Sequence, residues 1–346
     1  MSFIFLAPIC SVLCQSKSTF KVHTIAFYNV ENLFDTINDP ITFDDDRTPE
    51  GKDKWTGDIY RDKINHLAAV IAVIGKEVTQ SSPALLGLAE VENRQVVEDL
   101  IKDPALNKNT YGVVHEDSPD RRGIDVALIY NKSVFTYISH QAHELMLYDS
   151  EDPSKRVYTR DQLVVSGLLD GELLYFIINH WPSRSGGEAR SSYKREAAAA
   201  LNLRIIDSLQ VVSPDAKIVS MGDFNDDPIN TSIKQVLQTR EKKKDVKTMG
   251  LYNPMEAMYK AGIGTLAYRD TWNLFDQIII SEPFLRKDYS TYQFYKAGIF
   301  NSDFLVTPSG RYKGYPFRSF ANGTYTGGYS DHFPVYIYLI KEVSKS

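Results

Sequence analysis

The sequence predicts an α/β protein in which two mixed β-sheets face each other, as a four-layer sandwich with helices on the outer faces. Two observations carry this prediction. Short apolar runs typical of buried strands recur along the whole chain and are interleaved with only a few helical segments. Several of these runs are close enough to pair as hairpins, which favours packed mixed sheets. Because neither a linker nor an internal repeat is present, we expect one domain over residues 20–346.

The composition of the 346 residues, 43% hydrophobic and 24% charged, is that of a soluble globular protein. The formal net charge of -5 argues against a protein that holds nucleic acid through a global positive field, because phosphate binding leaves a basic footprint. A polyanionic partner must therefore be met by a local basic patch or through a metal ion. Beyond the N-terminus no stretch approaches the ~20 apolar residues of a membrane span. We expect a monomer without such a span.

The first 19 residues resemble a secretory signal peptide. Residues 2–14 are uncharged and mostly apolar, and the chain becomes polar over residues 15–19. The segment lacks a basic n-region, so two alternatives remain. Either the start of the sequence is placed too late, or the segment is only an apolar tail. Both cysteines of the chain, Cys10 and Cys14, fall in this segment, so a chain cut after it could form no disulfide. We expect a secreted or periplasmic protein, with a lipoprotein as an open alternative.

Expected secondary structure begins with a strand at residues 22–28, where hydrophobicity alternates. Residues 35–58 are rich in aspartate and contain proline and glycine, so we expect a long polar loop. Apolar residues recur at helical spacing over residues 60–74, which predicts an amphipathic helix ending at Gly75. The positions on its apolar face are Ile64, Leu67, Ile71 and Ile74.

The remaining strands are expected at residues 84–89, 111–115, 124–130, 162–168, 173–179, 218–221, 277–280 and 335–340. Two of them, 162–168 and 173–179, are joined by Asp170-Gly171, a dipeptide typical of a two-residue hairpin turn. A second helix is expected over residues 193–209, which carry a run of alanines.

Polar side chains stand at the ends of five expected strands, where a stable core does not require them. They are Asn29 and Glu31, Glu90, Asn179 and His180, Asp223 and Asn225, and Asp331 and His332. Active sites of layered α/β folds lie at such strand ends. In residues 222–225, Gly-Asp-Phe-Asn, the acid and the amide point the same way and offer oxygens to a hard cation or a phosphate. Alone, the tetrapeptide would be more typical of an ordinary turn.

Asp276 enters a strongly apolar strand. Burial of a carboxylate is unfavourable unless the charge is paired, so this residue needs a partner such as an imidazole or a cation.

Six short motifs follow one another along the chain. They are Asn-Val-Glu at 29–31, Leu-Ala-Glu-Val at 88–91, Gly-Ile-Asp-Val-Ala at 123–127, Asn-His-Trp-Pro-Ser-Arg at 179–184, Gly-Asp-Phe-Asn at 222–225 and Ser-Asp-His-Phe-Pro-Val at 330–335. In these motifs the chain resembles the endonuclease/exonuclease/phosphatase superfamily, in its deoxyribonuclease-like, secreted bacterial branch. The resemblance covers nearly all of residues 22–340. It implies the four-layer sandwich and metal-dependent cleavage of a phosphodiester by water.

The resemblance implies a set of metal ligands. Glu90 would be the principal ligand of Mg²⁺ or Mn²⁺, with Asn29, Glu31 and Asp331 supporting the ion directly or through water. Few protein ligands are needed, because Mg²⁺ keeps several waters and prefers oxygen donors. Glu92, close to Glu90, is expected at the surface.

The resemblance also implies groups for proton transfer. His332 would be the general base on the attacking water, with Asp276 fixing its tautomer and stabilising its charged form. His180 would donate to a phosphate oxygen or act as acid toward the leaving group. Asp125 is either the partner that orients His180 or a plain structural acid. The other histidines are expected to be structural or on the surface: His23, His66, His115, His140 and His143.

Substrate positioning is assigned to a third group. Asp223 and Asn225 would position the nucleophile and the phosphate. Arg160, Asn179 and Arg184 would bind the substrate phosphate.

Three function classes follow. The leading hypothesis is a nuclease acting on DNA, with RNA as an open alternative. A phosphatase or phospholipase of the same fold, acting on inositol phosphates or sphingomyelin, is the second, since fold does not choose the substrate. Leu-Phe-Asp-Gln at 274–277 replaces the Trp-x-Asp-Arg of the inositol-phosphatase branch and counts against that substrate. A non-catalytic binding protein is the third, and the complete set of acids and histidines argues against it.

Overall fold

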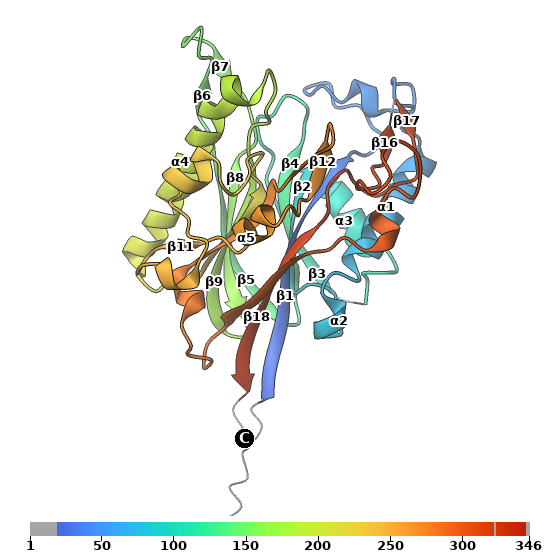
Figure 1. Cartoon of the computed structure of the whole chain (residues 1–346). Helices are drawn as coiled ribbons and strands as arrows, with labels where there is room; N and C mark the ends of the chain where they lie inside the picture. Colours follow the sequence, from blue (N-terminus) through green and yellow to red (C-terminus); the bar gives the residue numbers. More distant parts are fainter. Residues whose placement is uncertain (1–18, 109, 322, 344–346) are drawn as a thin grey trace, which may run out of the picture.

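Two six-stranded mixed sheets pack face to face with helices on their outer faces, which confirms the predicted fold class (Figure 1). This computed structural model describes residues 19–108, 110–321 and 323–343. The expected signal peptide, residues 1–19, therefore lies outside the described part except for Thr19, and Cys10 and Cys14 lie outside it as well.

The first sheet has the strand order β15-β18-β1-β2-β4-β3. Its members are β1 (Thr19–Leu33), β2 (Leu85–Val91), β3 (Tyr111–His115), β4 (Asp125–Asn131), β15 (Gln293–Ile299) and β18 (Val335–Val343). Only β1 and β2 run parallel. The outer face packs against α1 (Gly57–Ile71) and α3 (Arg94–Lys102), whose apolar sides complete one buried cluster.

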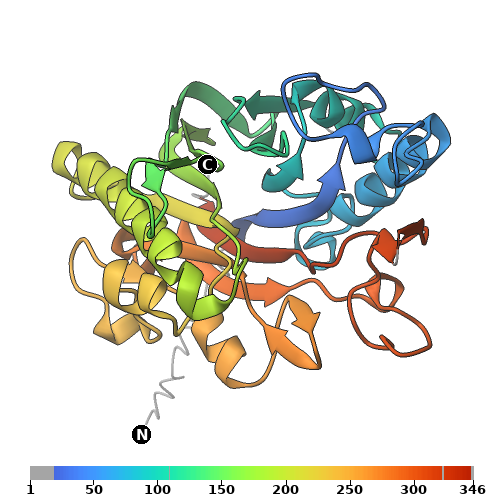
Figure 2. The same ribbon diagram turned by 90° about the horizontal axis from the view of Figure 1, so that it is seen from above.

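The second sheet has the order β11-β14-β10-β9-β8-β5. Its members are β5 (Phe135–His143), β8 (Gln162–Leu169), β9 (Glu172–His180), β10 (Ile218–Asp223), β11 (Leu251–Tyr252) and β14 (Asp276–Ser281). Here β9 and β10 are the parallel pair. The long helix α4 (Glu188–Val212) covers the outer face. Viewed from above, α4 and the pair α1 and α3 lie on opposite sides of the two sheets (Figure 2).

Between the sheets lies the largest apolar cluster. Phe27 from the first sheet meets Ile178 and Met221 from the second around Gly87, where an added Cβ would approach all three side chains within 3.4 Å. Because protein cores are close-packed, this layer fixes how the two sheets face each other.

Short elements fill the connections. They are α2 (Lys76–Thr79), β6 (Leu147–Tyr148), β7 (Arg156–Val157), α5 (Met255–Lys260), β12 (Leu266–Tyr268), β13 (Thr271–Asn273), β16 (Phe320–Ala321) and β17 (Thr324–Tyr325), together with five single-turn segments: Asp45–Arg47, Ser232–Val236, Lys243–Asp245, Glu282–Leu285 and Asp303–Leu305. Within the described residues, no helix is long and apolar enough to cross a membrane.

All expected strands and both expected helices are present; β3 has the expected bounds, and the other elements have at least one shifted end. The Asp170-Gly171 turn has positive φ at both residues, as a type I′ hairpin requires. Sequence reasoning did not predict β5 or α3. Most of β5 is exposed on both faces, so no hydrophobic alternation marks it. In α3 the side chain of Asn93 caps the helix by accepting from the amide of Val96 at 3.1 Å.

We expect Gly222→Ala to lower the free energy of unfolding by at least ~2 kcal/mol, since overpacking a core typically costs ~1–3 kcal/mol. A Cβ at Gly222 would stand 2.2 Å from the carbonyl oxygen of Asn179, and that backbone cannot move without disturbing β9. Urea denaturation measures the change. Gly57→Ala is the control, because its Cβ meets the Arg61 side chain at an ordinary 3.6 Å. Equal stability of the two variants would contradict this packing.

Candidate active site

Strand direction brings the polar strand ends to one place. In the parallel pair β1–β2, Asn29 and Glu90 lie at the register shift near the strand ends, and in the pair β9–β10, His180 and Asp223 are the last residues. Contacts across the sheets join them: Asn29 Nδ2 donates to Asp223 Oδ2 at 3.1 Å, and His180 Nε2 lies 3.8 Å from Glu90 Oε1. The two sheets therefore meet at an edge lined by polar groups.

Two more residues reach this edge from antiparallel strands. Asp276 begins β14 and is registered opposite Asp223 of β10. His332 precedes β18, which runs antiparallel to β1. Its Nδ1 lies 2.7 Å from Asp276 Oδ2, and its Nε2 faces Asp223 Oδ2 at 4.0 Å. The imidazole partner expected for the buried Asp276 is therefore present, and it leaves Nε2 of His332 directed into the site.

The two histidines have opposite protonation tendencies. Burial lowers the pKa of His332, but the charges of Asp276 and Asp223 outweigh it and hold this pKa well above the usual 6.5. Burial, together with the positive charges of Arg160 and Arg122, holds the pKa of His180 well below that value. At neutral pH the metal-free site thus contains an imidazolium and a neutral imidazole.

Burial also raises the pKa of the Asp223 carboxyl. Its Oδ1 accepts from the backbone amide of Asn225 at 2.9 Å, and its Oδ2 accepts from Asn29. The side-chain nitrogen of Asn225 donates to the carbonyl of Trp181 at 2.9 Å. Asp223 is therefore rigidly held, and it is a stronger proton acceptor than an exposed aspartate.

Local backbone irregularity aims the expected metal ligands. Register shifts interrupt the β1–β2 and β2–β4 pairing, and Glu31 and Glu90 both adopt positive φ there. Such bulges re-aim side chains at sheet rims. Glu90 Oε2 accepts from the amide of Asn32 at 3.0 Å, which leaves Oε1 toward His180.

The four expected metal ligands do not form one tight group. Glu31 is held by Arg318 Nε at 3.2 Å and by the amide and hydroxyl of Ser319 at 2.6 and 2.8 Å. Arg318 also donates to Asp331 at 3.1 Å. Among the described residues, the group at this edge within ligand reach is instead Asp223, Asp276 and His332.

Oxygen donors suited to a hard divalent cation are nevertheless present. Glu90 Oε1 and Asp331 Oδ1 face the site, 3.8 Å from His180 Nε2 and 3.9 Å from His332 Nε2 respectively. With the Asn29 side chain beside them, these donors fit an ion that keeps several of its waters.

Asp125 does not orient His180, which corrects that alternative. Its Oδ1 accepts from the amide and hydroxyl of Ser118, and its Oδ2 lies 3.2 Å from His115 Nε2. Within the described residues, His180 Nδ1 has no hydrogen-bond partner. Asp125 is registered opposite Val91, the last residue of β2, and its side-chain contacts are with the β3–β4 connection.

Arg160 is also placed differently from the expectation of a phosphate contact. Its buried guanidinium donates to Asp120 at 3.0 Å and to the carbonyls of His180 and Trp181 at 3.2 and 2.6 Å. An arginine needs several acceptors when it is buried, and here they come from the protein itself. Arg160 therefore holds the end of β9 in place.

Asn179 points away from the site. Side chains alternate along a strand, so Asn179 faces the helix layer when its neighbour His180 faces the catalytic edge. Its Nδ2 donates to Ser220 at 3.0 Å, and its Oδ1 accepts from Asn202 of α4 and from Trp181 at 2.9 and 3.1 Å. The residue links the sheet to its helix and does not face a substrate phosphate.

Arg184 likewise makes internal contacts. It donates to the carbonyl of Asn225 at 3.0 Å and to Asp227 at 3.2 Å, and its guanidinium lies over the Phe275 ring at 4.5 Å. It braces the loop after β10, because the acceptors of that loop surround it.

Sequence reasoning missed Arg318 and misplaced Glu92. No motif surrounds Arg318, and only the fold brings it between two carboxylates. Glu92 is buried, accepts from the amide of Asp35 at 2.6 Å, and has its pKa raised by burial to about 8. The position of Glu92 directly after strand β2 was the sequence feature that could have indicated its burial.

A cleft of about 580 Å³ opens beside Arg318. Its lining combines cations with aromatic rings: Arg47, Lys52, Arg122 and Arg318 with Phe34, Phe43 and Phe320, together with Asn32, Asp46, Asp53 and Gly323. Phe43 is 70% exposed. Four cations against two aspartates give the lining a positive balance, and Arg47, Arg122 and Arg318 are each paired with a neighbouring carboxylate.

An imidazolium and a neutral imidazole beside buried carboxylates suit the hydrolysis of phosphate esters, a reaction that moves protons and stabilises added negative charge. Residues 24–341 match the model of the Endonuclease/Exonuclease/phosphatase family, and the chain belongs to this family. Its members are hydrolases of phosphodiesters or phosphate esters.

Solved structures share the fold. A Bacteroides thetaiotaomicron protein of the same family is 16% identical, with a TM-score of 0.55 and coverage of 95% of this chain and 98% of that one. Humanised D. rerio TDP2 is 15% identical, with a TM-score of 0.54 and coverage of 92% and 99%. The B. thetaiotaomicron mannosyl-6-phosphatase Bt3783 is 17% identical, with a TM-score of 0.52 and coverage of 92% and 99%. A comparison with curated proteins gave no match.

We expect the two histidines to titrate differently in NMR spectra of the metal-free protein. His332 should keep its imidazolium form well above pH 6.5, and His180 should stay neutral well below it. Asp276→Asn removes the nearest counter-charge, so the pKa of His332 should fall. Near-UV circular dichroism controls for folding. Two ordinary titrations near 6.5, or an unchanged His332 in the variant, would contradict the charge arrangement.

Proposed function

We propose that the protein is a Mg²⁺- or Mn²⁺-dependent phosphodiesterase that cleaves nucleic acid, with DNA as its main substrate. The basic, aromatic-lined cleft that begins at Arg318 is the observation that carries this proposal. A phosphomonoesterase needs to hold one phosphate, whereas a nucleic acid strand presents further phosphates and bases beyond the scissile bond. Cationic side chains can contact successive phosphates of a nucleic-acid strand, and a base can stack on an exposed ring such as Phe43.

The comparisons support the same substrate class. Among the solved structures of this fold is D. rerio TDP2 in complex with a single-strand DNA product, at 13% identity and a TM-score of 0.54. The mannosyl-6-phosphatase of the same fold is the reason to test phosphomonoesters beside nucleic acids.

Glu90 and Asp331, with Asn29, would hold the metal ion. When bound, such an ion supplies Lewis-acid stabilisation of the phosphoryl oxygens and lowers the pKa of water. The rest of the chemistry falls to the side chains described above. Asp331 is paired with Arg318, so that arginine would have to share or release it.

The charges favour a division of roles that differs from the expectation of His332 as base. As an imidazolium, His332 would donate through Nε2 to a phosphoryl oxygen and balance the negative charge that develops. Asp223, with its raised pKa and its oxygen facing both histidines, would accept the proton of the attacking water. His180, being neutral, would donate a hydrogen bond but is a poor source of a proton. The water oxygen bonds to phosphorus as the bond to the leaving oxygen breaks, and the leaving oxygen takes its proton from solvent water.

We further propose that the enzyme is secreted or periplasmic, on the basis of the apolar N-terminal segment.

A substrate panel tests the proposal. Purified protein with Mg²⁺ or Mn²⁺ should cleave single- or double-stranded DNA faster than RNA, mannose 6-phosphate, an inositol phosphate or sphingomyelin. His332→Ala should lower kcat by ~10²–10³-fold, the usual cost of removing one hydrogen-bond donor to a developing negative charge. Turnover of the lipid or of a phosphomonoester without DNA cleavage would overturn the nuclease assignment.

The cleft itself is tested by Lys52→Ala. We expect weaker DNA binding and a salt dependence whose slope falls by about 1, as for the loss of one phosphate contact. Lys76→Ala, on the separate short helix α2, removes the same charge elsewhere on the surface. Equal changes in the two variants would show that the cleft has no special part in binding.

A further inference from the structure

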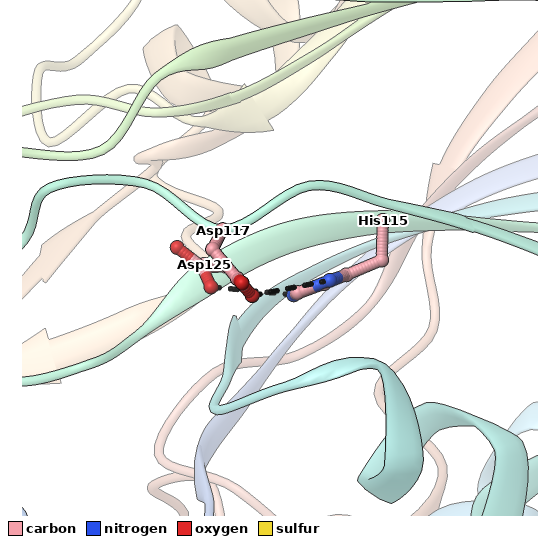
Figure 3. A group of neighbouring side chains, drawn as sticks. All are labelled: His115, Asp117 and Asp125. Carbon is pink, nitrogen blue, oxygen red and sulfur yellow. Dashed lines mark ion pairs between the residues drawn. The ribbon is translucent and has the colours of Figure 1, made fainter. Parts of the chain in front are cut away.

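His115, Asp117 and Asp125 form a second group of potential ligands, separate from the catalytic edge. His115 ends β3, Asp125 begins β4, and Asp117 lies in the loop between them. Figure 3 shows the three side chains pointing toward one another. One ligand atom from each residue lies within 4.8 Å of the other two.

The imidazole of His115 is the observation that points to an ion. Its side chain is only 2% exposed, and Nε2 lies 3.2 Å from Asp125 Oδ2, yet this nitrogen makes no hydrogen bond within the described residues. The two groups form an ion pair at this distance, and the charge of His115 acts on Asp125. The same nitrogen and oxygen would become donors to an ion placed between them.

The spacing of the atoms also fits. Tetrahedral ligand bonds to zinc of ~2.0–2.2 Å place neighbouring donor atoms about 3.3–3.6 Å apart. The distance between His115 Nε2 and Asp125 Oδ2 is 3.2 Å, just below this interval, so a small outward shift of either atom would admit the ion. Asp117 Oδ1 is 3.8 Å from the other ring nitrogen, His115 Nδ1, and because the Asp117 side chain is 88% exposed it is free to turn toward an ion held between Nε2 and Asp125. Water would complete the coordination.

Neighbouring groups orient the ligands and attract a cation. The amide and hydroxyl of Ser118 hold Asp125 Oδ1, which leaves Oδ2 as the donor. Asp161 lies in the same electrostatic environment: burial, Glu144 and Asp125 together raise its pKa to about 6. Asp161 Oδ1 is buried and, among the described residues, has no hydrogen-bond partner.

We propose that His115, Asp117 and Asp125 bind a divalent transition-metal ion of the zinc class, at a site distinct from the catalytic centre. One imidazole nitrogen with two carboxylates favours such an ion over Mg²⁺ and Ca²⁺, which prefer oxygen donors alone.

The ion would join β3, the following loop and β4. The same loop carries Asp120, which binds Arg160, and Arg160 in turn holds the carbonyls of His180 and Trp181. Occupancy would therefore stabilise the loop and the end of β9 that carries a catalytic histidine, so Zn²⁺ should raise the melting temperature.

Isothermal titration of the metal-free full chain with Zn²⁺, in excess Mg²⁺, tests the site. We expect one Zn²⁺ per chain and an imidazole nitrogen in its X-ray absorption spectrum. Asp117→Asn, an exposed change that preserves the fold, should weaken Zn²⁺ binding by at least ~10-fold. Glu116→Gln is the matched control, because Glu116 is also exposed but pairs with His140 outside the group.

His332→Ala separates this site from the catalytic one, because it removes the imidazole of the other group within ligand reach, and it should keep the Mg²⁺-resistant Zn²⁺. The proposal is overturned if no Zn²⁺ binding survives excess Mg²⁺, if His332→Ala abolishes it, or if Asp117→Asn and Glu116→Gln weaken it equally.

Discussion

The direction of four central strands is the constraint on which the rest of this structure depends. Each sheet has one parallel pair at its centre, β1–β2 and β9–β10, and the two sheets face each other so that all four carboxyl ends meet. The hydrogen bond from Asn29 to Asp223 joins them across the interface. The proposed roles depend on this meeting point, because it brings together residues that are distant in sequence, including Asp276 at the start of the antiparallel strand β14 and His332 just before the antiparallel strand β18.

That convergence concentrates buried charge, and the charges must offset one another. Asp276 and Asp223 would be unfavourable in an apolar edge on their own, and the imidazolium of His332 compensates both. The same arrangement sets the protonation states of the site. His332 is charged, His180 is neutral, and both face Asp223. Arg160 stabilises the backbone of the site, because its hydrogen bonds hold the end of the strand that carries His180. Stability and function thus rest on the same interactions.

Sequence reasoning predicted the two-sheet fold and the edge where the site lies, since apolar strand patterns and polar strand ends are local properties. It also predicted that Asp276 needs an imidazole or a cation, because a buried carboxylate must be paired. It failed for Asn179 and Arg160. Whether a strand-end residue faces the helices or the site depends on sheet register, and whether an arginine is free depends on acceptors distant in sequence. Arg318 carries no local signal, because its loop meets Glu31 only in the folded chain.

A crystal structure with Mn²⁺ and inorganic phosphate tests the central claim most directly, namely that the four strand ends form one metal-dependent phosphoryl site. Anomalous scattering should place Mn²⁺ on the Glu90 carboxylate, with a phosphate oxygen within hydrogen-bonding distance of His332 Nε2. Mn²⁺ bound away from Glu90, or phosphate bound away from both histidines, would contradict the account.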